Sequence, residues 1–201
     1  MVGLIKPFEY LLVIILQNSL MFIEDQALVV QFKSASTKEA AYTNLVKKYQ
    51  EKLYWHIRRM VVEHEDANDV LQNTFIKVWN GLASFREDSQ LYTWLYRIAT
   101  NECLTFIEQI KRKSVINFDD IAEDFSNKVK ADANFDANRL EWKLQVAIQQ
   151  LPEKQRVVFN LRYYDEMPYE EMSQVLDTSV GALKASYHHA AKKIEEFIKN
   201  S

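Results

Sequence analysis

The sequence predicts an all-α protein. The 201 residues include only 3 Gly and 3 Pro, so residues that interrupt helices are scarce. Hydrophobic residues make up 48% of the chain, and over long stretches they recur every three or four positions, which is the spacing of one helix face. A chain of this length can form one or two domains of ordinary size.

Charge and cysteine content limit the class of protein. The formal net charge is -3, whereas a free-standing DNA-binding protein is usually basic. The composition therefore favours a protein that reaches DNA together with a larger partner. Cys103 is the only cysteine, which excludes an internal disulfide and a cysteine-based zinc site and suits the reducing cytoplasm.

Residues 1–23 form an apolar extension. Its uninterrupted apolar run, residues 10–16, has 7 residues, whereas a membrane-spanning helix needs about 20. A signal peptide is disfavoured because only Lys6 precedes the run and no small-residue cleavage site follows it. An alternative hypothesis is that Met21 is the true start and residues 1–20 are an upstream extension of the reading frame; N-terminal sequencing of the native protein tests this.

Residues 24–113 form the first predicted helical block. Its apolar side chains follow a helical spacing that is interrupted only at polar runs. The expected helices span residues 24–62 (broken at 34–36), 67–81 and 91–113, with a polar loop at 83–90. We expect residues 64–66 to end the first helix and Asp66 to cap the second, because Asp69 follows three residues later.

The long first helix also has a basic side. We expect most of these cations to lie on a face exposed to solvent; they are Lys47, Lys48, Lys52, Arg58 and Arg59.

Residues 114–138 follow the first block and carry six acidic residues against two lysines. Such a composition predicts a flexible acidic linker between two helical blocks.

Residues 139–200 form the second block, which ends in two helices joined by a tight turn. Pro152 ends the first amphipathic helix of the block, and Pro168 is expected in the first turn of a later one. Helices at residues 169–176 and from residue 180 leave Asp177 in a left-handed conformation, with a Ser or Thr as N-cap. This outline is typical of a helix-turn-helix, although an ordinary helical hairpin is the alternative.

Three motifs carry a resemblance to a known family. They read DANDVLQNTFIKVWNGLASF at 66–85, TWLYRIATNECLTFI at 93–107 and LPEKQRVVFNLRYYDEMPYEEMSQVL at 151–176. Together they resemble the extracytoplasmic-function (ECF) group of sigma-70-type RNA polymerase sigma factors. The resemblance covers about residues 24–112 and 139–199.

The resemblance implies a fold and a mechanism. A region 2 domain of three or four helices (24–113) would bind the clamp coiled coil of the β′ subunit of core RNA polymerase and melt and capture the −10 promoter element. A region 4 domain of four helices (139–200) would read the −35 element as duplex DNA. The implied partners are core polymerase and promoter DNA, with an anti-sigma factor as a further candidate, and no catalysis, cofactor, metal or small-molecule substrate is expected.

The same resemblance implies three sets of site residues. The polymerase-binding set comprises Asp66, Asp69, Gln72, Asn73, Phe75 and Trp79. The −10 set comprises Phe85, Arg86, Ser89, Trp94, Arg97 and Asn101. The −35 set in the recognition helix comprises Lys184, Ser186, Tyr187, His188, His189 and Lys192. Phe75 and Trp79 also lie on the apolar stripe, which favours core packing over polymerase binding for both. For Trp94, core packing is an alternative role.

The recognition helix departs from the family pattern. Lys184 is kept, but Ser186, His189 and Ala191 stand where the family usually has arginine. Fewer cations mean fewer phosphate contacts and weaker DNA binding by this domain alone. His188 and His189 are neighbours about 100° apart around a helix, which makes them poor joint metal ligands.

Two other classes of function remain open at this stage. The second block alone suggests a stand-alone helix-turn-helix regulator, and residues 4–23 suggest a membrane-tethered protein. Co-purification with core polymerase separates the sigma factor from the regulator, and cell fractionation separates the membrane protein from both. A nuclease or deaminase is disfavoured because the sequence has no paired-carboxylate site, zinc-ligand set or phosphate-binding Gly loop.

Overall fold

The computed structural model describes residues 21, 24–113 and 140–200. The predictions made for most of the N-terminal extension and for the acidic linker lie outside these residues. Within the described ranges the chain is all helical, as predicted, with no strand. None of the described helices is both long and apolar enough to cross a lipid bilayer.

The first group of helices follows the predicted order. Residues 24–33 are helical, and a break at 34–37 precedes the next helix. The helices that follow are α2 (Lys38–Val61), α3 (His64–Gly81), the short 3-10 helix η1 (Leu82–Ser84) and α4 (Leu91–Lys113). Polar residues at 34–36 therefore mark a helix break, and the polar loop before α4 separates two helices as expected.

The prediction for the junction between α2 and α3 was wrong. Helix α2 ends at Val61, and α3 begins at His64 with Glu63 as its N-cap residue. Asp66 lies inside the first turn, where its negative charge interacts favourably with the positive end of the helix dipole. The chain turns at Val62, which is buried and has a φ of 69°. A β-branched residue rarely adopts this conformation, so packing rather than local propensity sets the boundary.

The second group contains α6 (Leu140–Gln149), α7 (Glu153–Tyr163), α8 (Tyr169–Leu176) and α9 (Val180–Asn200). Pro152 and Pro168 are the N-cap residues of α7 and α8, with ψ values of 140° and 147°. Pro168 therefore precedes the first turn of α8 instead of lying in it, because the extended backbone of a cap residue also suits a fixed proline φ.

The turn between α8 and α9 has the predicted conformation. Asp177 is left-handed, with φ 48° and ψ 48°. Helix α9, which follows the turn, is capped by Ser179, whose Oγ accepts a hydrogen bond from the Ala182 backbone N–H at 3.3 Å. Left-handed backbone is tolerated by Asp better than by most residues with a side chain. The helix-turn-helix predicted from the sequence is confirmed.

Replacing Asp177 with valine is expected to lower the free energy of unfolding by about 1–2 kcal/mol, because a β-branched side chain clashes in left-handed backbone. Asp177→Gly is the matched control, and it should leave the stability equal to that of the original chain or slightly higher. Urea unfolding followed by circular dichroism measures both values. Equal stability of the valine and glycine variants would contradict the conformational argument.

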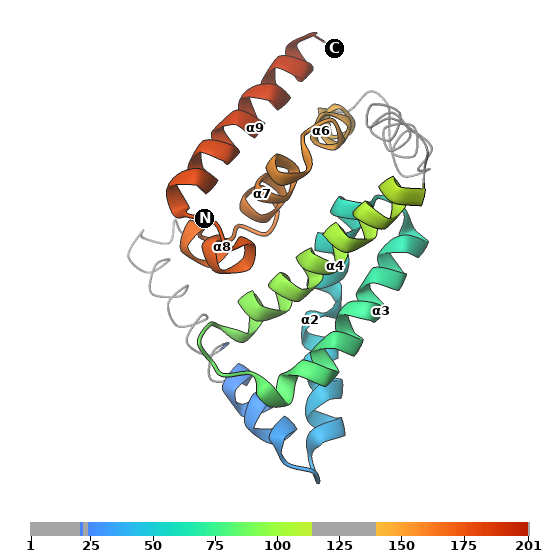
Figure 1. Ribbon diagram of the computed structural model, residues 1–201, viewed down its shortest axis with the longest axis vertical. Helices are drawn as coiled ribbons and strands as arrows, with labels where there is room; N and C mark the ends of the chain where they lie inside the picture. Colours follow the sequence, from blue (N-terminus) through green and yellow to red (C-terminus); the bar gives the residue numbers. More distant parts are fainter. Residues whose placement is uncertain (1–20, 22–23, 114–139, 201) are drawn as a thin grey trace, which may run out of the picture.

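The two groups of helices pack against each other. Helix α8 contacts α4, and α7 contacts α2, so the second group lies along one side of the first (Figure 1). One cluster of buried apolar side chains, here called the shared core, runs through both groups. Its members from the second group are Val157, Val158, Leu161, Met167, Met172, Val175 and Leu183. A smaller cluster lies within the second group between α6, α7 and α9.

Candidate functional site

The polymerase-binding candidates on α3 fall into two sets. Asp69, Gln72 and Asn73 are exposed, and their spacing of three or four residues places them on one helix face. Ile76 continues the same row and is 52% exposed, although sequence reasoning missed it. An apolar side chain that continues an exposed polar row is the signal that could have found it. We call Asp69, Gln72, Asn73 and Ile76 the α3 row.

Phe75 and Trp79 instead hold α3 in place. Phe75 is buried, and its backbone carbonyl accepts a hydrogen bond from the Tyr42 hydroxyl at 2.7 Å. The half-buried ring of Trp79 lies edge-on to Tyr42 and Phe32, with centroid distances of 4.9 and 5.3 Å. The Lys38 ammonium lies 4.5 Å from the Trp79 ring centroid. The alternative role of these two aromatics in core packing is therefore confirmed.

Asp66 lies apart from the exposed set. It is half-buried in the first turn of α3, close to the N-terminal end of the helix. Nearby, the Tyr54 hydroxyl and the Asn68 amide bond the two ring nitrogens of His64, at 2.7 and 3.1 Å. Asp66 therefore belongs to the helix start, where a carboxylate stabilises the helix, and the first exposed polymerase-binding candidate on α3 is Asp69.

The −10 candidates also divide by burial. Phe85 is buried and packs against Trp94, with ring centroids 5.2 Å apart. Trp94 is half-buried and lies so close to Gly81 that a Cβ added there would be 3.1 Å from the indole. These contacts fix the loop 85–90 on the end of α3. Phe85 and Trp94 therefore pack against each other, which leaves the other −10 candidates as the more accessible ones.

Polar side chains beside this aromatic pair are accessible. Arg86 is exposed and Ser89 is half-buried in the loop, and Arg97 and Asn101 are exposed one turn apart on α4. Two guanidinium groups, an amide and a hydroxyl can contact phosphates and the polar edge of an unstacked base. Four of the six −10 candidates are thus accessible, two in the loop and two on α4.

The recognition helix α9 presents most of its candidates to solvent. Lys184, His188, His189 and Lys192 are exposed, and Ser186 is half-buried. Tyr187 differs, because its ring stacks on Phe159 with centroids 5.6 Å apart and planes 11° apart. Burial raises the pKa of the Tyr187 hydroxyl. Tyr187 therefore anchors α9 to α7, and the remaining five side chains form the accessible set.

Comparison with known proteins assigns the family. A family model for sigma-70 region 2 matches residues 45–113, and one for region 4 matches residues 141–194. The ECF RNA polymerase sigma-E factor of Escherichia coli K12 is 35% identical over 179 residues, which are 85% of this chain and 92% of that protein. The chain belongs to the ECF group of the sigma-70 family.

Two further relatives of this sigma factor support the same family assignment. RNA polymerase sigma-H factor of Pseudomonas aeruginosa is 32% identical over 184 residues, covering 86% of this chain and 93% of the relative. ECF RNA polymerase sigma-E factor of Haemophilus influenzae is 33% identical over 183 residues, covering 87% and 95%. The α3 row and the −10 region thus lie in sigma region 2, and the exposed face of α9 lies in region 4.

Solved structures show that the sigma factor also shares its fold with known proteins. A chain in the structure of CnrH in complex with the cytosolic domain of CnrY matches with a TM-score of 0.64 at 23% identity, covering 89% of this chain and 99% of that one. A chain in the complex of the sigma factor RpoE with the anti-sigma factor NepR from Bartonella quintana matches with a TM-score of 0.59 at 20% identity, covering 79% and 96%.

Proposed function

We propose that this sigma factor directs core RNA polymerase to specific promoters and assists DNA melting, with no catalysis of its own. The observation that carries the proposal is the α3 row, an accessible polar face with one apolar member in the helix that matches the family's polymerase-binding motif. The clamp coiled coil of the β′ subunit is the proposed partner of this row, and the protein acts in the cytoplasm.

The two DNA elements are assigned to separate domains, with proposed boundaries at 24–113 and 139–200 around the linker 114–138. In the first domain, Arg86, Ser89, Arg97 and Asn101 contact the melted −10 strand. In the second, four exposed side chains of α9 and the half-buried Ser186 contact the −35 duplex; the exposed ones are Lys184, His188, His189 and Lys192. The accessibility of both sets supports this division.

An anti-sigma factor is a further proposed partner. The support comes from the matched structure in which a sigma factor is bound to an anti-sigma factor. Co-purification from cells, with and without core polymerase, tests for such a protein. A second chain that binds the sigma factor only in the absence of polymerase is the expected result.

Run-off transcription tests the central proposal. The purified chain is added to core polymerase with genomic DNA fragments, and discrete transcripts are expected that require both proteins. A stand-alone regulator would bind DNA fragments without core polymerase and would start no transcripts. Failure both to bind core polymerase and to produce discrete transcripts would overturn the proposal.

Lys184→Glu is expected to weaken binding of the −35 duplex about tenfold, because one phosphate contact is lost and a repulsive charge is added. Binding to core polymerase should be unchanged, since Lys184 lies far along the chain from the α3 row. Lys199→Glu is the matched control, because Lys199 is exposed in the last turn of α9, about 22 Å along the helix from Lys184. Loss of polymerase binding in Lys184→Glu would contradict the division of labour between the domains.

A further inference from the structure

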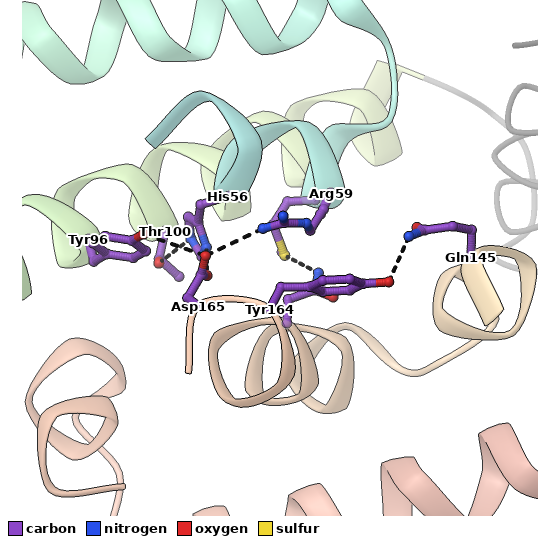
Figure 2. Close-up of polar contacts among 9 residues, drawn as sticks. His56, Arg59, Tyr96, Thr100, Gln145, Tyr164 and Asp165 are labelled. Atoms are coloured by element: carbon purple, nitrogen blue, oxygen red, sulfur yellow. Dashed lines mark hydrogen bonds and ion pairs between the residues drawn. The ribbon is translucent and has the colours of Figure 1, made fainter. Parts of the chain in front are cut away.

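Asp165 lies at the contact between the two domains, in the turn between α7 and α8. Figure 2 shows its carboxylate pointing toward side chains of α2 and α4. One oxygen is 2.9 Å from His56 Nδ1, and the other is 3.4 Å from Arg59 Nη1. The Tyr96 hydroxyl donates to the second oxygen at 3.5 Å. Three donors from the first domain thus surround one acceptor from the second.

These groups are buried. The side chains of Asp165 and His56 are 6% and 0% exposed, and burial beside the Asp165 carboxylate raises the pKa of the Tyr96 hydroxyl. Because a carboxylate only accepts hydrogen bonds, His56 Nδ1 carries the proton toward Asp165. The other ring nitrogen, Nε2, lies 3.0 Å from the Thr100 hydroxyl of α4. Both nitrogens of the buried imidazole therefore have partners.

Further contacts cross the domain boundary beside this group. The Arg59 guanidinium lies 4.3 Å from the ring centroid of Tyr164, and its backbone carbonyl accepts a hydrogen bond from the Gln149 amide at 3.2 Å. The Asn160 amide lies 3.6 Å from Met60 Sδ, and Lys111 pairs with Glu153. A buried polar group costs free energy when it loses its partners, so these contacts favour one docking geometry.

The closed arrangement conflicts with the proposed function, on which the following inference rests. By their names the −10 and −35 elements lie about 25 base pairs apart, which at about 3.4 Å per base pair is roughly 85 Å along B-DNA. Domains joined through Asp165 cannot contact both elements at once. In addition, α8 packs against α4, although the first helix of a helix-turn-helix crosses the DNA backbone when bound.

The length of the chain permits the domains to separate. About 26 residues lie between Lys113 and Leu140, and an extended chain reaches at most about 3.3–3.6 Å per residue, or roughly 90 Å in total. Separation therefore requires release of the domain contact without unfolding of either domain.

We propose that Asp165 is the centre of a latch that holds the free sigma factor closed, and that core polymerase binds productively only when the latch opens. His56, Arg59 and Tyr96 are its partners in the first domain. Opening leaves each domain folded and frees α8 and α9 for the −35 duplex.

Cys103 provides a probe for the latch in the intact chain. It is the only cysteine and is fully buried in the shared core. It lies on α4 one turn beyond Thr100, and it shares its buried apolar cluster with Val157 and Val158 of α7. Its reaction with a thiol reagent such as DTNB therefore reports separation of the domains.

Asp165→Asn is expected to raise the rate of Cys103 labelling about tenfold, because His56 and Arg59 lose a charged acceptor in a buried site. Addition of core polymerase to the unaltered chain should raise the rate in the same direction. Arg59→Met is a second variant that should open the latch, and it leaves Asp165 in place. The Arg59 side chain is 23% exposed, so its replacement does not leave a fully buried site empty. Circular dichroism verifies that each variant is folded.

Asp25→Asn is the matched control. Asp25 is also a buried aspartate, and it accepts hydrogen bonds from Tyr49 and Lys48 within the first domain, at 2.6–3.0 Å. It should leave the labelling rate of Cys103 within about twofold of the original. Equal acceleration by Asp25→Asn and Asp165→Asn would overturn the latch, because general loosening would then explain the labelling. Unchanged labelling in both Asp165→Asn and Arg59→Met would overturn it as well.

The test separates the latch from the proposed function. Faster labelling in the two variants without any binding of core polymerase would support the closed contact through Asp165, and it would refute the sigma activity together with release of the latch by core polymerase. Polymerase binding and discrete transcripts with Cys103 labelling unchanged would refute the latch and leave the sigma activity intact.

Discussion

Replacing Trp79 with alanine is expected to lower the free energy of unfolding of the first domain by about 3–5 kcal/mol, the usual cost of removing a large packed aromatic side chain. The indole contacts Phe32, Tyr42 and Lys38. Its removal leaves a cavity between the 24–33 helix, α2 and α3. Urea unfolding followed by circular dichroism measures the loss.

The control for this prediction comes from the same helix. Gln72 is exposed on α3, so Gln72→Ala should change the free energy of unfolding by less than about 0.5 kcal/mol. If Trp79→Ala lost polymerase binding but kept its stability, the indole would be a polymerase contact and its assignment to the core would be wrong.

Replacing Asp69 with arginine is expected to weaken binding to core polymerase on the order of 100-fold, because a charged contact is lost and a repulsive one is introduced. Asp69 is the only charged member of the α3 row and is exposed, so the fold should not change. Fluorescence anisotropy with labelled sigma factor and core polymerase measures the affinity, and circular dichroism verifies the helix content.

Glu108→Arg is a suitable control for the charge reversal. Glu108 is an exposed acid on α4, and it pairs across one helical turn with Arg112 at 3.3 Å. Its reversal should leave the affinity for core polymerase unchanged within about twofold. An equal loss of affinity in both variants would mean that net charge, and not the α3 row, determines binding.

Local patterns predicted the helices because the signals that define them are local. The helical spacing of apolar residues, the polar breaks and the prolines before α7 and α8 all act within a few residues. The Asp177 turn was predicted in its conformation for the same reason, since a short polar side chain tolerates left-handed backbone. The junction at Val62 failed because no Gly, Pro or Asn marks it, and packing holds the residue there.

The contacts between the domains could not be predicted in this way. Arg59 was expected on a solvated face, and so was Lys48, yet Arg59 contacts Asp165 and Lys48 pairs with Glu24 and Asp25. Asp165 is more than 100 positions from His56 in the sequence, and nothing near either residue marks the other. Burial likewise decided which site candidates are accessible: the sequence pattern treats Phe85 and Arg86 alike, whereas only Arg86 is exposed.

The shared core makes the contact between the two domains sensitive to temperature. Separation of the domains exposes to water those apolar side chains of the shared core that lie between the two domains. Exposure of apolar surface carries a positive heat-capacity change, and hydrophobic association weakens as the temperature falls. The balance between the closed and the open chain is therefore a function of temperature, and the apolar part of the domain contact contributes less in the cold than at 37 °C.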